Sequence, residues 1–434
     1  MTFHWTFFVR SAFAVLLASL FSWSSTQQGF GQSGIGGDPG TAGPPGIEVI
    51  HWWTSGGEKA AVSVFQTEFD RLGPNKWIDS PVVDGAEAMK TIFARVRGGN
   101  PPGAAQFNIS RQFDQLIKEE RLLDLTPLAK KERWRRIIRP KSVLGACERN
   151  GHIWCVPVNI HSWQWAWVSL PVLQKSGVPV PRDMDEFLAA APKIKEAGYI
   201  PFALGGEPWQ EYGLFGVLML NMAGRDVHYK LYKNRNTAVA RSQKVARVFE
   251  AFRALRVYSD KSAKGRSWSK TTDLVINDKA ALQIMADWAR GEFAQAGKTP
   301  GVDYECIPGP SENPYFQVGG DVFIFPKQSD PEIEKAQLKL ASMMLNPRVQ
   351  TLFNMAKGSL PVRDDVDLSL ADSCVKKGLN ILKRRGSVVE NNELFLSGST
   401  VNKIQILLDK FLWDDSISVE AAQNSFAKIL ASDR

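Results

Sequence analysis

The 434-residue sequence lacks the short motifs that mark most hydrolases and nucleotide-binding enzymes. It contains no G-x-S-x-G, no H-E-x-x-H and no P-loop. Its five histidines are scattered along the chain and form no motif. These absences argue against a serine hydrolase, a zinc protease and a nucleotide-dependent enzyme. We therefore predict a protein with no catalytic residues and no cofactor.

Cysteine is scarce as well, and the sequence holds Cys147, Cys155, Cys306 and Cys374. Their intervals do not resemble the spacing of zinc ligands, which predicts that there is no metal site. In an exported protein such cysteines form disulfides. Asn150-Gly151 is a hairpin signal, so the two cysteines that flank it are placed to face each other, and the other two would then pair. Three pairings are arithmetically possible, and the sequence leaves them open.

Charge of one sign is not abundant either. The formal net charge is +8, and removal of the first 32 residues, which hold Arg10 and no acidic residue, lowers it to +7. The densest basic stretch, residues 130–141, also carries Trp134, Ile137 and Ile138. An apolar side of this kind is typical of a solvated helix face and not of a nucleic-acid site. We predict no nucleic-acid partner.

Long apolar runs are missing apart from one near the N-terminus, Ser11–Phe21, which follows Arg10. This run is too short to span a bilayer comfortably and lies where a secretory signal would lie. We predict a signal peptide over residues 1–32, with an uncleaved anchor as the alternative, and a flexible Gly- and Pro-rich leader over residues 33–46. No cysteine follows the run, which argues against a lipoprotein. The predicted localisation is the periplasm.

Tryptophan, by contrast, is abundant, with 14 copies against 7 tyrosines. The indole ring offers a flat apolar face and one donor, which suits a ligand with C–H faces and polar edges, although most copies are expected to fill the core. His161, Trp163, Trp165 and Trp167 alternate within residues 153–168, and a period of two predicts a strand.

Strand and helix signals alternate along the rest of the chain. Residues 47–53 predict a first strand, and Ser55 with Glu58 forms a capping box that marks the start of a helix. A helix over residues 86–97 and a strand over 104–109 follow. The alternation predicts α/β layers with largely parallel sheets.

Six motifs together resemble the periplasmic extracellular solute-binding proteins of ABC sugar transporters (family 1), and within them the glucose/mannose-binding branch. The motifs are HWWTSGGE (51–58), GNPPGAAQ (99–106), VPVNIHSWQWAWV (156–168), GGEPWQ (205–210), MADWARGEF (285–293) and KGSLPVR (357–363). Each motif is weak alone, but their order and spacing make the resemblance specific. It extends from about residue 47 to the C-terminus.

The resemblance implies an α/β, two-lobed periplasmic-binding-protein fold with a ligand cleft between lobes joined by hinge crossings. Lobe one would comprise residues 47–158 and 318–361, and lobe two residues 159–317 and 362–434. Hinge closure around a ligand is the motion expected of such proteins. The implied function is to bind a monosaccharide, a hexose such as glucose or mannose, and to deliver it to the permease subunits in the membrane. The receptor is expected to be a monomer.

The resemblance also implies a set of residues that hold the sugar. They are Trp52, Trp53, Glu58, Gln106, His161, Trp288, Asp321 and Lys357. The tryptophans would wall the cleft, the two carboxylates would accept from sugar hydroxyls, and the lysine would donate to them. Adjacent tryptophans on one strand point to opposite faces, so one of the pair has the core as its alternative place. His161 has the same alternative.

One departure from the family pattern leaves the identity of the sugar open. The glucose-binding branch carries a histidine in a small-residue loop near the C-terminus, whereas residues 390–395 read ENNELF here. Asn391, Asn392 or Glu393 takes that place, or the contact is missing.

Three alternative functions are kept open. They are an exported glycoside hydrolase that uses Glu58 and Asp321, the same fold with an oligosaccharide, polyol or sugar acid as its ligand, and a receptor that reports its ligand to a sensor.

Overall fold

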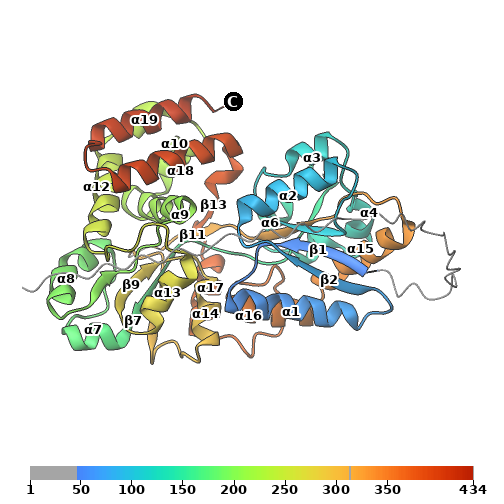
Figure 1. The fold of residues 1–434 in the computed structure, drawn as a ribbon, viewed down its shortest axis with the longest axis horizontal. Coiled ribbons are helices and arrows are strands. Elements are labelled where there is room, and N and C mark those ends of the chain that lie inside the picture. Colours follow the sequence, from blue (N-terminus) through green and yellow to red (C-terminus); the bar gives the residue numbers. More distant parts are fainter. Residues whose placement is uncertain (1–45, 312–313, 434) are drawn as a thin grey trace, which may run out of the picture. The chain divides into compact units, whose positions relative to one another are not determined.

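Two mixed sheets organise the computed structural model, which describes residues 46–311 and 314–433 (Figure 1). The predicted signal peptide and nearly all of the predicted leader lie outside these residues. The first sheet has the order β2-β1-β3-β12-β6, and the second has the order β10-β7-β9-β8. Two separate sheets, each covered by helices, confirm the α/β two-lobed fold. We call the part around the first sheet lobe one and the part around the second sheet lobe two.

The strands of the first sheet run in both directions. They are β1 (Gly46–His51), β2 (Lys76–Pro81), β3 (Ala104–Asn108), β6 (Cys155–Pro157) and β12 (Asp321–Ile324). β1 is parallel to β2 and β3, whereas β12 is antiparallel to β3 and β6. A parallel neighbour needs a crossover within the same sheet. β12 instead enters from lobe two, so it is free to run the other way.

The second sheet is mainly antiparallel. Its strands are β7 (Trp165–Ser169), β8 (Ile200–Phe202), β9 (Ala280–Ile284) and β10 (Tyr304–Pro308). β7 is antiparallel to both β9 and β10, and the β8–β9 pair is parallel. The expectation of largely parallel sheets is therefore wrong, because strands that arrive from the other lobe are not bound by the crossover rule.

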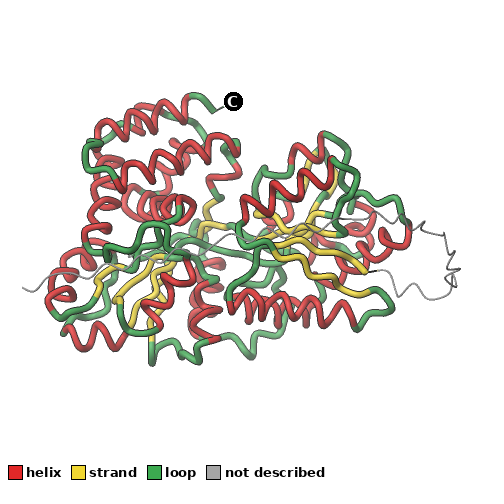
Figure 2. Tube along the Cα trace, in the orientation of Figure 1, coloured by secondary structure: helices red, strands yellow, loops and turns green. Residues whose placement is uncertain are grey.

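Helices cover both sheets, and Figure 2 shows a group of them beyond the second sheet. Lobe one carries α1 (Gly56–Asp70), α2 (Gly85–Arg97), α3 (Asp114–Lys118), α4 (Thr126–Lys131), α5 (Trp134–Ile137), α6 (Lys141–Gly145), α15 (Pro331–Met344) and α16 (Pro347–Lys357). Lobe two carries α7 (Leu170–Ser176), α8 (Met184–Glu196), α9 (Pro208–Leu218), a π-helical turn (Met219–Ala223), α10 (Arg225–Tyr232), α11 (Thr237–Ala240), α12 (Gln243–Val257), α13 (Trp268–Ile276), α14 (Ala289–Gln295), α17 (Ser373–Lys383), α18 (Gly398–Trp413) and α19 (Val419–Ala431).

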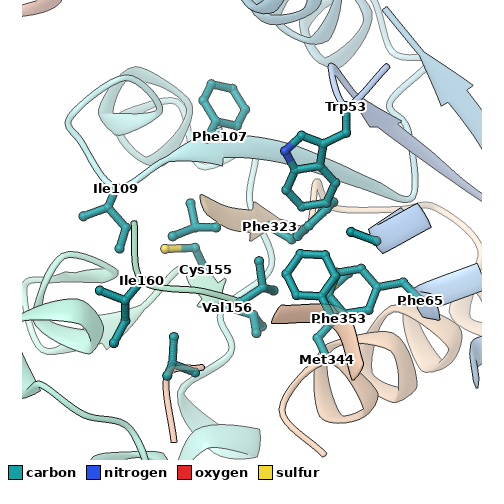
Figure 3. Packing of buried hydrophobic residues seen from close by; sticks show 14 of the residues in the cluster. Trp53, Phe65, Phe107, Ile109, Cys155, Val156, Ile160, Phe323, Met344 and Phe353 are labelled. Carbon is teal, nitrogen blue, oxygen red and sulfur yellow. The ribbon is translucent and has the colours of Figure 1, made fainter. Parts of the chain in front are cut away.

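Local sequence signals explain where the first helix begins and why it packs. The Ser55 side chain accepts from the backbone N–H of Glu58, and the Glu58 side chain reaches back to the Ser55 N–H, so the predicted capping box is present. Further along α1, Phe65 stacks on Phe353 of α16 with ring centroids 4.1 Å apart. Figure 3 shows these rings beside Phe323 in the core of lobe one. This stacking packs α1 against α16.

Three segments cross between the lobes. They are residues 158–164, which lead from β6 to β7, residues 309–311 and 314–320, which lie between β10 and β12, and residues 358–372, which lead from α16 to α17. Isolated bridges join Ile160 to Leu360 and His161 to Gly319, so the crossings lie side by side. The predicted strand over residues 153–168 is thus interrupted by a crossing. The exact residues at which the lobes divide remain a prediction.

Two short strands pair at the second crossing, which leads into β12. β11 (Phe316–Val318) pairs in parallel with β13 (Val388–Glu390), and a 3-10 turn (Asn392–Leu394) follows β13. This pairing brings the C-terminal loop to the crossing that leads into β12.

Both disulfides have the arrangement that the hairpin signal favours. Cys147 bonds to Cys155, and Cys306 bonds to Cys374. Between the first pair, β4 (Glu148–Arg149) and β5 (His152–Ile153) form a hairpin. Asn150 and Gly151 turn it with φ values of 53° and 81°.

Two further predictions can be compared with the described residues. The basic stretch forms two short helices, with Trp134 and Ile138 buried while Lys130, Lys131, Arg133, Arg135 and Arg136 are exposed, which confirms a solvated face. Within residues 46–311 and 314–433, no helix is long and apolar enough to cross a membrane.

Candidate ligand-binding site

The predicted polar residues meet where β3, β12 and the first crossing segment come together. Gln106 on β3 is fully buried, and its side-chain oxygen accepts from the Trp52 N–H at 3.0 Å. Its amide nitrogen donates to Asp321 Oδ1 at 2.9 Å. Gln106 thereby ties the end of β1 to the start of β12, and both of its polar groups are satisfied.

Asp321 receives three side-chain donors. Besides Gln106, Asn159 Nδ2 lies 2.7 Å and His161 Nε2 lies 3.0 Å from Asp321 Oδ2. The Asp321 N–H donates in turn to Asn159 Oδ1 at 2.6 Å. Burial raises the pKa of Asp321, but the bonds from His161 and Asn159 and the positive charges nearby lower it further, so the net pKa falls below the usual range. The carboxylate is held ionised.

His161 bridges two carboxylates that come from different sheets. Its Nδ1 lies 2.5 Å from Asp287 Oδ1 in the segment after β9, and its Nε2 faces Asp321 on β12. Burial lowers the pKa of His161, but the two carboxylates raise it more, and the net pKa is raised. Both ring nitrogens are engaged by protein groups, so a sugar contact through this ring stays a prediction.

Glu58 and Lys357 form a second buried pair. Lys357 Nζ lies 3.5 Å from Glu58 Oε1, while Glu58 Oε2 accepts from the N–H groups of Thr54 and Ser55 at 3.1 and 3.2 Å. Glu58 therefore caps the helix and pairs with the lysine at the same time. The ammonium lies 5.6 Å from the ring centroids of both Trp53 and Trp288. The Lys357 ammonium therefore lies between Glu58 and Trp53 of lobe one and Trp288 of lobe two.

The two adjacent tryptophans take different places. Trp53 is 1% exposed and packs against Phe323 and Phe353, with ring centroids 5.6 and 5.4 Å away. Trp52 is half-buried, and one face of its ring lies over Gly85 at the start of α2. Of the pair, Trp52 keeps a ring surface that a ligand can cover. A ligand contact by Trp53 stays a prediction.

Trp288 belongs to a group of four half-buried indoles in lobe two, which we call the tryptophan group (Trp163, Trp209, Trp268 and Trp288). The centroid of Trp288 lies 5.2 Å from that of Trp163, 6.3 Å from that of Trp209 and 6.4 Å from that of Trp268. Trp163 and Trp268 were not predicted as site residues. The alternating run at 161–167 was the available signal for Trp163, whereas Trp268 opens α13 without any motif.

The three candidate residues of the C-terminal loop, Asn391, Asn392 and Glu393, make different contacts. Asn392 is buried and donates to the Tyr212 hydroxyl at 2.8 Å, so it is committed to the protein. Asn391 accepts from the Glu393 N–H at 3.0 Å. The Glu393 carboxylate is half-buried and has no hydrogen-bond partner among residues 46–311 and 314–433, and burial raises its pKa to about 7. Glu393 is therefore the member of the loop with free acceptors.

Arginine side chains near the site are occupied elsewhere. The Arg290 guanidinium donates to the carbonyls of Asn354 and Met355 and pairs with Asp372 at 2.8 Å. Arg363 forms an ion pair with Asp365. The described residues contain no group of histidine, cysteine and acidic side chains arranged to hold a metal ion. The chemistry offered is hydrogen bonding and aromatic stacking.

Comparison with known proteins identifies the class of this fold and site. Residues 53–351 match the model of the bacterial extracellular solute-binding protein family, and the chain belongs to that family. A probable sugar-binding periplasmic protein of Rhizobium meliloti (strain 1021) is 38% identical over 340 residues, which cover 77% of this chain and 80% of the relative. A protein of Brucella suis biovar 1 (strain 1330) with the same description is 36% identical over 343 residues, covering 79% of this chain and 80% of that one.

Solved structures agree on the fold at low sequence identity. The bacterial solute receptor AcbH, described as preferring β-D-galactopyranose exclusively, superposes with a TM-score of 0.74 at 18% identity. The alignment covers 89% of this chain and 98% of that one. A chitin oligosaccharide binding protein gives 0.74 at 17% identity, with the same coverage. The chain is a periplasmic solute receptor and not an enzyme, so the glycoside hydrolase alternative is wrong.

Proposed function

We propose that the chain is the sugar-binding component of an ABC importer and that it binds one neutral hexose between its lobes. The relatives described as probable sugar-binding periplasmic proteins support the ligand class. Two more distant relatives point to single sugars: the xylose/arabinose-binding protein XacG of Haloferax volcanii, at 23% identity, and the glucose-binding protein GlcS of Saccharolobus solfataricus, at 22%.

The observation that carries the proposal is the pairing of aromatic faces with a polar set whose cations already have carboxylate partners. Lys357 is paired with Glu58, and His161 lies between two aspartates. Arg290 and Arg363 are turned to other partners. A sugar acid would need a cation free to clamp its carboxylate. A neutral sugar needs only acceptors and donors for its hydroxyls and a flat ring for its C–H face, which Trp52 and Trp288 offer.

An oligosaccharide is the second candidate, and the tryptophan group favours it. Trp163, Trp209 and Trp268 add half-buried indole surface beyond Trp288. A longer ligand would use these surfaces for a second ring. We favour the hexose because the indoles contact one another edge to face or at a tilt, so each covers part of its neighbour's surface.

Binding is proposed to close the hinge, with Trp288 brought over the sugar and the closed receptor recognised by the permease. The protein is proposed to act as a monomer. Small-angle scattering with and without a saturating sugar measures closure as a fall in the radius of gyration. An unchanged radius with a tightly bound sugar would contradict the closure.

The deciding experiment is a melting-temperature screen of the protein without residues 1–32 against single sugars, disaccharides, polyols and sugar acids. A ligand present at about one hundred times its dissociation constant stabilises by about 2.7 kcal/mol. A shift with glucose, mannose or galactose but not with disaccharides supports the proposal. A shift only with larger sugars favours the oligosaccharide, and a shift with none removes sugar as the ligand.

A further inference from the structure

Asp287 was not among the predicted site residues, yet its side chain and its backbone both bond to the first crossing segment at the junction of the lobes. It is 3% exposed and follows β9 of the second sheet. Its Oδ1 lies 2.5 Å from His161 Nδ1, and its Oδ2 accepts from the Ser162 N–H at 3.2 Å. Its backbone N–H donates to the Ser162 carbonyl at 3.2 Å. Asp287 is therefore bonded to both His161 and Ser162 of the first crossing segment.

The chain Asp287–His161–Asp321 connects the two sheets through one imidazole ring, and we call it the His161 bridge. Both carboxylates are at most 4% exposed. A neutral ring between two ionised, buried carboxylates would leave two negative charges without compensation, and an imidazolium reduces this number to one. An imidazolium satisfies both, because each ring nitrogen then donates to one carboxylate. The geometry thus calls for a protonated ring.

The charged groups around the bridge agree with this assignment. Lys357 from α16 opposes the proton on the ring, but Glu58 from α1 lies 3.5 Å from that ammonium. Arg290 on α14 points away, to Asp372 and the end of α16. Burial raises the pKa of Asp287, whereas the carboxylates of Asp287 and Asp321 raise the net pKa of His161 despite its burial.

We propose that Asp287 is a positioning residue for sugar binding, which acts through His161 to fix Asp321 as an ionised acceptor. Asp287 touches no sugar. It holds the ring in place and keeps it charged, and the charged ring holds the Asp321 carboxylate. The inference rests on the proposed function, in which Asp321 accepts from a sugar hydroxyl.

The proposal predicts a pH dependence that a merely structural aspartate would not produce. The imidazolium is present below the pKa of His161 and is lost as the pH rises through it. Asp287→Asn keeps the size of the side chain and an oxygen for the Nδ1–H, but removes the charge that raises the pKa. The variant is therefore expected to lose the imidazolium at a lower pH than the wild type.

The test measures D-glucose affinity by calorimetry between pH 5.5 and 8.5 and the His161 pKa by NMR in the sugar-free protein. In D287N we expect the His161 pKa to fall by about one unit or more. At pH values above the His161 pKa of both proteins, this fall corresponds to about a tenfold loss of affinity relative to the wild type. Near pH 5.5 the two proteins should differ least. Asp372→Asn, which removes the carboxylate partner of Arg290 at the start of α17, is the matched control and should leave the pKa of His161 unchanged.

Two results would overturn the proposal. One is a D287N protein with the His161 pKa and the affinity profile of the wild type. The other, which needs no folded variant, is a wild-type spectrum in which His161 is neutral at pH 6. If the wild type binds no D-glucose, the proposed hexose function fails, while the NMR measurement still decides the bridge.

Discussion

The Glu292 carboxylate accepts a hydrogen bond from the Gly57 amide at 2.9 Å, and so joins α14 to the first turn of α1. The two residues are separated by 235 positions in the sequence. The unsatisfied amides and the positive end of the dipole at a helix N-terminus favour a carboxylate there. Gly57 is adjacent to Glu58, the partner of Lys357. The N-terminus of α1 therefore contributes both to the candidate site and to the interface with α14.

The same interface depends on the absence of side chains, which gives the first prediction. A Cβ on Gly291 would lie 2.9 Å from the carbonyl oxygen of Ala356 and 3.4 Å from the Cα of Gly57. Backbone atoms cannot yield as a flexible side chain does, so Gly291→Ala should force α14 away from α1 and α16. We expect a loss of about 1–3 kcal/mol in the free energy of unfolding, measured by chemical denaturation.

Gly216→Ala is the control for that substitution. Gly216 lies within α9, and a Cβ there would meet nothing within 4 Å. Alanine is a better helix former than glycine, so this variant should be as stable as the wild type or up to about 1 kcal/mol more stable. Equal stability of the G291A and wild-type proteins would show that the contact between the helices is looser than it appears.

The adjacent tryptophans allow site and core to be separated by experiment. Trp53→Ala removes a fully buried indole from the rings of Phe323 and Phe353, which should cost about 3–5 kcal/mol of stability. Trp52→Ala removes a half-buried ring at the end of the strand. It should change stability much less and weaken sugar binding instead.

Calorimetric affinity and melting temperature, measured on both variants, check this prediction. The expected pattern is a large loss of affinity with a small melting shift for W52A. A W52A protein that binds sugar as the wild type does would remove Trp52 from the site, whatever its stability.

The sequence was sufficient for features that are encoded locally. The capping box at Ser55, the turn at Asn150-Gly151 and the helix over residues 86–97 depend on a few neighbouring residues, and all three are present. Gln106 was found through a motif and Asp321 through the family resemblance, and the two side chains lie in hydrogen-bond contact. These signals needed no knowledge of the path of the chain.

Other features depend on how distant segments meet, and no local pattern reports them. Asn159 and Asp287 were missed because their partners lie 162 and 126 positions away. The strand directions were missed because β12 enters its sheet from the other lobe. The contrast between Trp52 and Trp53 follows from the place where β1 ends, which the sequence leaves uncertain by a residue or two.

The two disulfides should differ in their contribution to stability. Cys306 and Cys374 are separated by 68 positions and join β10 to α17, whereas Cys147 and Cys155 are separated by only 8. In the chain-entropy account the longer loop contributes about 4.4 kcal/mol and the shorter one about 2.6 kcal/mol. Replacing Cys306 and Cys374 by alanine should therefore lower the denaturation midpoint more than replacing Cys147 and Cys155. The opposite order would indicate that the hairpin disulfide stabilises the native state by other means.

Glu393 should make stability fall as the pH rises toward neutrality. Burial raises the pKa of this carboxyl from its usual 4.5 to about 7, so the folded protein binds the proton more tightly than the unfolded chain does. The resulting stability is fully present below pH 4.5 and is lost between pH 4.5 and about 7. Glu393→Gln keeps the size but cannot ionise, so its advantage over the wild type should grow across that window, to a value on the order of 2 kcal/mol.

Denaturation of both proteins at pH 4.5 and at pH 8 measures this difference, and sugar affinity at the same two values adds a second readout. Asp372→Asn serves again as a comparison, since that carboxylate is paired with Arg290. If Glu393 accepts from the sugar in its ionised form, the affinity of the wild type should rise from pH 4.5 to pH 8, opposite in direction to its stability, and E393Q should lack that rise. A wild type and an E393Q protein with parallel stability profiles would show that this carboxyl is ionised at its usual pKa and is solvated.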